Sequence, residues 1–397
     1  MTGFCVLLLA TIWLAVPAAA APSDAALRAA LQRDIDQYLS TRSKIEHLSA
    51  ISLSISLHGQ SENINVTAGR TQYGGATPVT PQNLWQIGSQ NKAFTAATIL
   101  QLEAEGKLMI DETVGRWLPQ YPAWKNVTIR RLLNMTSGIP SYDDTPAMNA
   151  AYAKNPKQTF TVAELIAYVY PKNNPHAPPP TKGYSYSNTN YLLAELIIER
   201  ATGRSYASEL ERRFLRSNIG LHNAYYADSI YPRGVRDRMV SGYFFGHGPE
   251  FAQLAPLLRT DLRYDSVSWA RAAGGIVSSP EDLMRWVRAL YTGPMLAPRQ
   301  RAELMSLVSL KTGKRIRTTS ADEPRGFGLG VAQMTESLTG TTWFYEGDSM
   351  GYRMVYVYYP RQDAVIAFGL NSMPGAENKS GILADTLYKT LHAAGQL

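Results

Sequence analysis

The chain has 397 residues, of which 45% are hydrophobic and 18% are charged. This composition excludes disordered, collagen-like and low-complexity proteins, and it provides enough apolar side chains for a large core. Lys and Arg number 39 against 32 Asp and Glu, and the resulting net charge of +7 is small for this length. Because no run of five or more basic residues occurs, the charge supports only a general attraction to anionic polymers, and nucleic-acid binding is not expected.

Residues 1–20 have the pattern of a secretory signal peptide. Phe4–Val16 is an apolar run that ends at Pro17, and the alanines after it predict cleavage after Ala20. The run is shorter than the roughly 20 residues that a membrane span needs, so no stable span is expected after cleavage. The first residues carry no Lys or Arg, which leaves an uncleaved anchor as the alternative. We expect a periplasmic or secreted protein.

Cysteine and histidine usage limits the chemistry. The only cysteine, Cys5, lies within the predicted signal peptide, so the mature chain has no disulfide, thiolate nucleophile or Cys-bound metal. The six histidines are far apart and form no H-x-H or H-E-x-x-H pattern. We therefore predict neither a metal site nor a cofactor.

The first part of the mature chain predicts a helix, a hairpin and a second helix. Apolar residues at helical spacing favour a helix over 24–40. Alternating apolar residues at 51–57, followed by a turn and a second run at 64–67, favour a β-hairpin. A strong helical pattern covers 90–105 and ends at Gly106.

The middle of the chain, 107–270, is predicted to be helical and rich in loops. A short helix at 129–134 begins at Thr128, which is a favourable N-cap. A proline-dense loop covers 171–180, and a helix follows at 189–201. The middle thus differs from the two ends of the chain, where strands are predicted.

The last part of the chain returns to strands. Apolar, β-branched and aromatic residues favour strands at 327–334, 342–345, 352–359 and 364–370, and a final helix covers 376–393. We expect an α/β (α+β) fold with a central antiparallel sheet flanked by N- and C-terminal helices and with an inserted, mainly helical lobe.

The expected domain organisation is a single unit over 21–397. Its sheet lobe would comprise about 24–90 and 271–397, and its helical lobe about 91–270. A ligand site is expected in the cleft between the two lobes.

The sharpest chemical signal is Ser89-Gln90-Asn91-Lys92, the only S-x-x-K in the chain. Residues three apart lie on one face of a helix, so the Lys92 amine can reach the Ser89 hydroxyl. The helix N-terminus also places the Ser89 N–H at the positive end of the helix dipole. Lys92 can act as a base only if its surroundings lower its pKa. The alternative is an N-cap serine followed by a surface lysine.

A second signal is Tyr186-Ser187-Asn188, the only Y-x-N in the chain, which precedes the helix at 189–201. A phenol at Tyr186 can relay a proton between a serine and a leaving group. The Asn188 amide can hydrogen-bond a substrate carbonyl. The neighbouring Tyr184 and Tyr191 are interpreted as packing residues.

Four segments, in this order, resemble the serine β-lactamase-like hydrolases, which include class C β-lactamases, D-alanyl-D-alanine carboxypeptidases and related esterases. The segments are Ser89–Lys92 with the residues up to Leu108, Leu132–Pro140, Tyr186–Tyr191, and Ala273–Ser279 with Asp282. The similarity covers nearly the whole mature chain, about 26–392. It implies the fold of β-lactamases and penicillin-binding proteins and a serine hydrolase that acts through an acyl-enzyme.

The chain departs from the family at the third box, which is K-T-G or H-x-G on the innermost strand. Lys311-Thr312-Gly313 comes too early in the chain and is interpreted as a solvated loop. The matching position is Tyr345-Glu346-Gly347-Asp348. In relatives the first residue of the box is a cation that binds a substrate carboxylate, a charge that Tyr345 cannot supply. The resemblance still implies an oxyanion hole formed by the N–H groups of Asp348 and Ser89.

Tyr142 and Ser349 are two further candidates. Tyr142, just after Pro140, is expected either to line the site or to lie on the surface. Ser349 stands in a G-x-S-x-G pattern, but a nucleophile elbow needs a helix after the serine, and 352–359 alternates like a strand. Ser349 is therefore not favoured as a nucleophile.

These observations predict a secreted serine hydrolase that cleaves an ester or amide through a Ser89 acyl-enzyme. Lys92 and Tyr186 would exchange protons, and Asn188, Tyr345 and Gly347 would help to bind the substrate. The substrate would be a small molecule or peptide, either a D-alanyl peptide derived from peptidoglycan or an ester that lacks the carboxylate. β-Lactamase activity is one alternative. A catalytically idle protein that binds cell-wall fragments is the other, because Glu346 would place negative charge near the oxyanion hole.

Overall fold

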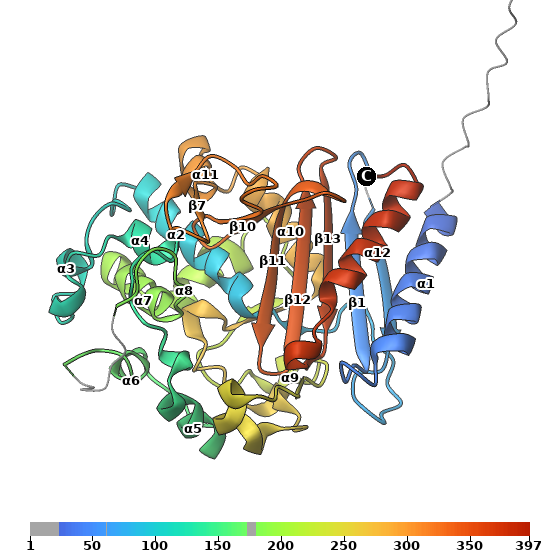
Figure 1. Cartoon of the computed structure of the whole chain (residues 1–397), viewed down its shortest axis with the longest axis horizontal. Coiled ribbons are helices and arrows are strands. Elements are labelled where there is room, and N and C mark those ends of the chain that lie inside the picture. Colours follow the sequence, from blue (N-terminus) through green and yellow to red (C-terminus); the bar gives the residue numbers. More distant parts are fainter. Residues whose placement is uncertain (1–23, 61, 173–179) are drawn as a thin grey trace, which may run out of the picture.

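A computed structural model describes residues 24–60, 62–172 and 180–397 (Figure 1). The predicted signal peptide lies outside these residues, as does most of the 171–180 loop. Within the described ranges, no helix combines the length and the apolar character that crossing a membrane requires.

The described residues form a nine-stranded antiparallel sheet in the order β2-β1-β13-β12-β11-β10-β9-β7-β8. The strands are β1 (Ala50–Ser56), β2 (Ile64–Gly69), β7 (Leu307–Ser309), β8 (Arg315–Ile316), β9 (Arg325–Phe327), β10 (Ala332–Glu336), β11 (Gly340–Ser349), β12 (Tyr352–Tyr359) and β13 (Ala364–Leu370). β1 pairs with β13, with Ile51 opposite Leu370, so the two ends of the chain form one sheet. The predicted fold class is confirmed.

Two terminal helices cover one face of this sheet, α1 (Asp24–Arg42) and α12 (Ser380–Ala393) (Figure 1). Buried α1 residues recur every three or four positions, at Leu27, Leu31 and Ile35, and they join a core with residues of β1, β2 and β13. α10 (Pro280–Tyr291) packs on β1, β12 and β13 and belongs to the separate core on the other side of the sheet.

The middle of the chain supplies most of the remaining helices. They are α2 (Asn91–Ala104), α3 (Val114–Trp117), α4 (Ile129–Leu133), α5 (Pro146–Lys154), α6 (Val162–Ala167), α7 (Thr189–Thr202), α8 (Tyr206–Leu210), α9 (Arg233–Arg236) and α11 (Pro298–Leu304). The side chain of Thr128 accepts a hydrogen bond from the N–H of Arg131 and caps α4. Gly203, with φ of 67°, ends α7 in the left-handed conformation.

Short strands connect the helical part to the large sheet. β3 (Trp85–Gln86), β6 (Ile276–Ser278) and β4 (Ala224–Tyr226) form one small sheet, and β5 (Tyr243–Phe244) pairs with β14 (Ser372–Met373). The sequence did not predict them, because two or three residues are too few for an alternating pattern.

Two predicted boundaries are wrong. The strand predicted at 327–334 is two strands, β9 and β10, joined by a tight turn in which the N–H of Gly328 donates to the carbonyl of Val331. Gly330 in this turn has φ of 74°, and a Cβ there would lie 2.7 Å from the carbonyl oxygen of Lys92. The final helix begins at Ser380, after a separate 3₁₀ turn at Gly375–Glu377.

Candidate active site

Ser89 lies in a 3₁₀ turn, η1 (Gly88–Gln90), that leads directly into α2. This turn packs closely against β11. A Cβ on Gly88, whose φ is 50°, would lie 2.3 Å from the carbonyl oxygen of Asp348, and a Cβ on Gly347 would lie 1.9 Å from that of Ile87. Because no side chain fits at either contact, the two glycines let the strand pass directly beside the serine.

The side chain of Gln90 fixes this arrangement. Its Nε2 donates hydrogen bonds to the carbonyl oxygen of Tyr345 at 3.1 Å and to that of Met354 at 2.6 Å. The nucleophile candidate is thereby tied to both β11 and β12.

Lys92 lies one helical turn after Ser89 and is completely buried. Its Nζ lies 3.0 Å from Ser89 Oγ and donates to the carbonyl oxygen of Ala273 at 3.1 Å. The Tyr186 ring lies below the amine, with its centroid 4.8 Å away. Burial lowers the pKa of Lys92 to about 7, against a smaller opposite effect of the Asp143 charge. A substantial fraction of this amine is therefore neutral near pH 7, as a general base requires.

Tyr186 approaches Ser89 from the other side. Its hydroxyl donates to Ser89 Oγ at 2.7 Å and lies 3.3 Å from the hydroxyl of Tyr345. Since Tyr186 has one proton and donates it to Ser89, Tyr345 is the donor in the second hydrogen bond. Burial raises the pKa of both phenols, so both keep their protons at neutral pH.

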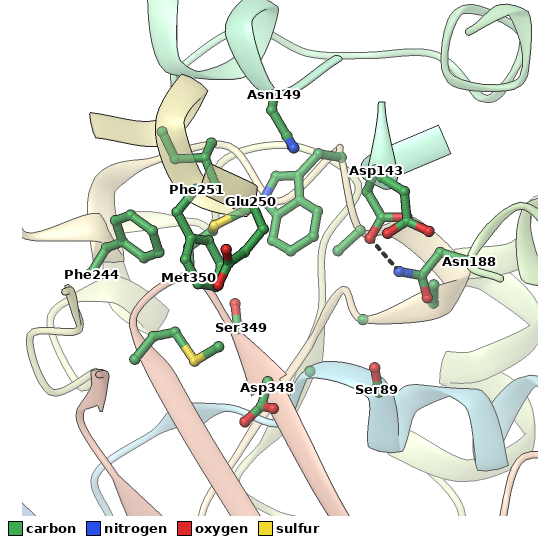
Figure 2. Close-up of a pocket in the computed structure, with 18 of the residues that line it drawn as sticks. Ser89, Asp143, Asn149, Asn188, Phe244, Glu250, Phe251, Asp348, Ser349 and Met350 are labelled. Carbon is green, nitrogen blue, oxygen red and sulfur yellow. Dashed lines mark hydrogen bonds between the residues drawn. The ribbon is translucent and has the colours of Figure 1, made fainter. Parts of the chain in front are cut away.

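Asn188 lies at the N-terminus of α7 and lines the cleft. Its Nδ2 donates to Asp143 Oδ2 at 2.6 Å (Figure 2), and its backbone N–H donates to Ser141 Oγ at 2.8 Å. Its Oδ1 is buried and has no hydrogen-bond partner among the described residues. The carboxylate of Asp143 thus fixes the amide that the sequence predicted to orient substrate.

The third-box residues lie on β11, where Tyr345, Glu346 and Asp348 line the cleft. The carboxylate of Glu346 accepts hydrogen bonds from Asn378 Nδ2 and Ser380 Oγ, each at 2.9 Å. Glu346 therefore directs its charge toward the start of α12 and away from Ser89. Burial and the neighbouring Glu346 raise the pKa of Asp348.

The literal Lys311-Thr312-Gly313 sequence forms the turn between β7 and β8. Lys311 Nζ donates to the carbonyl oxygen of Asp322 and does not line the cleft. This position agrees with the interpretation of the segment as a loop outside the site.

Tyr142 fits neither of the two expectations. It is fully buried, its hydroxyl donates to the carbonyl oxygen of Trp269, and its side chain does not line the cleft. Ser349 does line the cleft, but its hydroxyl donates to Gln86 Oε1, and β12 follows it instead of a helix. A nucleophile elbow is therefore absent at Ser349.

These residues surround a cleft of about 750 Å³ (Figure 2). Sequence reasoning missed the wall that lies across from Ser89, which comes from η3 (Tyr142–Asp144), α5 and the 3₁₀ segment η5 (Pro249–Leu257). Its lining residues include Asp144, Asn149, Glu250, Phe251 and Leu254, with Trp269 beside them. No motif contains these residues, and only the packing of α5 on η5 brings them together.

Comparison with known proteins identifies the family. The Beta-lactamase family model matches residues 35–388. The chain belongs to the Beta-lactamase family. Penicillin-binding protein 4* of Bacillus subtilis is 26% identical over 311 residues, which cover 77% of this chain and 64% of that protein. Protein flp of Staphylococcus aureus strain N315 is 28% identical over 269 residues, which cover 66% of this chain and 49% of that protein.

Solved structures of the Beta-lactamase family fold are also similar. D-amino acid amidase from Ochrobactrum anthropi SV3, complexed with L-phenylalanine, has a TM-score of 0.77 at 22% identity and covers 92% of this chain and 99% of its own. A D-stereospecific amidohydrolase from Streptomyces sp. has a TM-score of 0.74 at 24% identity, and the match covers 90% of this chain and 97% of that chain. A class C β-lactamase has a TM-score of 0.69 at 17% identity, and the match covers 94% of this chain and 98% of that chain.

The resemblance to serine β-lactamase-like hydrolases is confirmed by the family assignment. The chain spans less than two thirds of the length of the two relatives from Bacillus and Staphylococcus.

Proposed function

We propose that the protein hydrolyses an amide or ester through an acyl-enzyme formed on Ser89. The observation that carries this proposal is the convergence of Lys92 Nζ and Tyr186 OH on one serine oxygen, at 3.0 and 2.7 Å. Both are groups that exchange protons; Lys92 is completely buried, whereas Tyr186 is 36% exposed at the cleft. An N-cap serine with a surface lysine, the alternative from sequence, does not account for a lysine with no exposed surface.

The reaction begins with neutral Lys92, which accepts the hydroxyl proton of Ser89 while Oγ attacks the carbonyl carbon. The N–H groups of Ser89 and Asp348 bind the developing oxyanion, and such a donor is typically worth about 2.7–4 kcal/mol in the transition state. Tyr186 then protonates the leaving nitrogen or oxygen and recovers a proton from Lys92. Water attacks the acyl-enzyme in the reverse proton sequence, which releases the acid and restores Ser89.

Several observations bear on the substrate class. The amidase and amidohydrolase among the similar structures favour an amide. No Lys, Arg or His lines the described part of the cleft, which disfavours a substrate that depends on a bound carboxylate, including a β-lactam. We also propose secretion to the cell envelope, which the leader pattern at residues 1–20 supports.

Intact mass after brief exposure to p-nitrophenyl acetate tests this function. We expect an acetyl-sized increase in the mature protein and none in Ser89→Ala. Ser349→Ala is the matched control, since Ser349 also lines the cleft but has no base beside it. If wild type gains no mass and releases no p-nitrophenol above background, the proposal fails for this ester and the catalytically idle alternative is favoured. Equal labelling of wild type and Ser89→Ala would place the nucleophile elsewhere.

A further inference from the structure

The lining of the cleft is strongly biased in charge. Five acidic residues line its described part, and no Lys, Arg or His does. The acidic residues are Asp143, Asp144, Glu250, Glu346 and Asp348. Two basic residues, Lys92 behind Ser89 and Arg353 beside Asp348, are fully buried and do not line the cleft, so neither places positive charge at its surface.

Among the described residues, only two of these carboxylates have partners. Asp143 accepts hydrogen bonds from Ser141 and Asn188, and Glu346 accepts them from the residues at the start of α12. The carboxylates of Asp144, Glu250 and Asp348 have neither an ion pair nor a hydrogen bond among the described residues. All three residues are exposed to solvent, and carboxylates that line a cleft raise the local concentration of cations.

A buried polar side chain points to a ligand at the same wall. Asn149 is only 8% exposed, and its amide is directed from α5 into the cleft (Figure 2). Its side chain has no hydrogen-bond partner among the described residues, whereas most buried side-chain polar groups in proteins have one. This geometry leaves a ligand in the cleft as the hydrogen-bond partner of the Asn149 amide.

Glu250 faces the same space from η5, which packs against α5 (Figure 2). Aromatic rings of Phe251 and Trp269 line the cleft beside these polar groups. Aromatic faces attract cations and also bind apolar groups. The wall therefore suits a group that is both positively charged and partly apolar.

We propose that the cleft selects substrates whose acyl part carries a protonated amino group, and that Asp144, Asn149 and Glu250 bind this group. The inference rests on the proposed hydrolase function and assigns the substrate class of the same site. The carboxylates attract the ammonium. Figure 2 shows the amide nitrogen of Asn149 toward the cleft, and rotation of this unpartnered amide presents its oxygen as an acceptor for one ammonium N–H. An anionic substituent at this position would instead meet unpaired negative charge.

The test compares p-nitroanilides whose acyl parts are cationic, neutral or anionic. D- and L-phenylalanine p-nitroanilide carry an α-ammonium, their N-acetyl forms are neutral, and their N-succinyl forms are anionic. N-acetyl-lysine p-nitroanilide, in both enantiomers, carries its charge on the side chain. We expect kcat/KM to be highest for a cationic member and lowest for the N-succinyl forms. The comparison of the two cationic classes distinguishes an α-amino group from a basic side chain.

The variant Asp144→Asn/Glu250→Gln removes both charges with little change of shape. We expect the ratio of kcat/KM for cationic over neutral substrates to fall by about tenfold, because each partly exposed ion pair contributes modestly. The same ratio should fall with added NaCl. Asn149→Leu, which keeps the volume but removes the acceptor, should also lower it. Asp322→Asn is the control, since it removes an exposed carboxylate outside the cleft.

The outcomes separate the two proposals. Acylation of Ser89 by p-nitrophenyl acetate with equal or better turnover of neutral and anionic anilides would overturn the inference and leave the hydrolase function standing. A charge preference that survives the double variant would overturn the assignment of these residues. Failure of every ester and anilide to acylate Ser89 would instead count against the proposed function itself.

Discussion

The two walls of the cleft differ in whether their polar side chains have hydrogen-bond partners within the protein. On the catalytic wall, which we define as Ser89, Lys92, Tyr186 and Tyr345, every reactive group is hydrogen-bonded to another. On the α5–η5 wall, which we define as Asp144, Asn149 and Glu250, the side chains have no such partners among the described residues. The first wall is complete before a substrate arrives, whereas the second has polar groups left for the substrate to satisfy.

This difference assigns separate roles to the two walls. Preorganised contacts lower the barrier to the chemical step, because they need no rearrangement during the reaction. Unpaired polar groups discriminate between ligands, since a ligand that cannot pair with them leaves them desolvated. Substitutions on the catalytic wall should therefore change kcat for all substrates. Those on the α5–η5 wall should change the ranking of substrates.

The largest effect is expected from Lys92→Met, which keeps the buried stem and removes the base. kcat/KM for a neutral ester should fall by about 10²–10⁴, the usual contribution of general acid–base catalysis. In wild type, the rate should rise with pH through about 7 and then level off, because the neutral amine forms as Lys92 loses its proton. The variant should lack that rise.

Lys311→Met is the matched control for this lysine. It removes the lysine of the literal K-T-G sequence, which forms a turn outside the cleft. A normal pH profile in Lys311→Met and a flat one in Lys92→Met would support the assignment. An unchanged profile in Lys92→Met would show that a different group supplies the base.

Gly347→Ala tests how closely the catalytic wall depends on backbone contact. The added Cβ would meet the carbonyl oxygen of Ile87 and separate β11 from the turn that holds Ser89. We expect kcat to fall by about 10²-fold, as for other misplaced catalytic groups. Overpacking should cost about 1–3 kcal/mol of unfolding free energy in urea titrations.

Gly381→Ala provides the comparison, since a Cβ there meets no heavy atom within 4 Å. Its location near the start of α12 predicts equal or slightly higher stability and normal turnover. Wild-type activity in Gly347→Ala would contradict the importance of the close contact.

Tyr345→Phe removes the donor to Tyr186 without removing the ring. We expect kcat to fall by about 2- to 10-fold, equivalent to one hydrogen bond, with little change in KM for a neutral ester. Because the lost donor favoured the ionised form of Tyr186, any alkaline limb of the pH profile should move to higher pH.

Tyr184→Phe is the control for this phenol, since its ring packs on Phe327 as that of Tyr345 does. Equal effects of the two substitutions on kcat and on melting temperature would indicate a packing role. Tyr345→His, which restores a donor, should recover part of the kcat if the hydrogen bond is what matters.

The smallest effect is expected from Asp348→Asn, which keeps the backbone N–H and removes a negative charge beside the oxyanion. kcat for a neutral ester should rise by a few-fold at pH 8. The raised pKa of Asp348 means that wild type loses this charge as the pH falls, so the two proteins should converge in mild acid. Stopped-flow acylation rates of both proteins at pH 5.5 and 8 measure the effect. A rate lower in Asp348→Asn than in wild type at pH 8 would contradict the prediction.

The sequence predicted the catalytic wall better than the other wall for a physical reason. Ser89 and Lys92 are neighbours on one helix, so their spacing alone brings them together. The contact of Tyr186 with Ser89 spans 97 residues and was available only through the resemblance to a family. The third box was located by its order in the chain, although its residue types differ.

The α5–η5 wall had no comparable signal. Asn149 and Glu250 lie on elements that meet only in the folded protein, and neither is part of a recognisable motif. The sequence also left open which way Glu346 points, because strand register decides which side chains face the cleft. Tyr142 was misplaced for a similar reason, since its burial depends on the distant carbonyl of Trp269.

The strand order has a consequence for how this enzyme becomes active. Gln90 and Tyr345, which are hydrogen-bonded beside the nucleophile, are 255 residues apart, and β1 must wait for β13 before its second edge is paired. Contacts this distant in sequence slow folding and leave strand edges exposed in intermediates. Ser89 is therefore synthesised early, but β11, which carries the proposed oxyanion-hole residue Asp348, packs beside it late. Hydrolytic activity should appear in the last cooperative step of refolding, together with burial of the sheet.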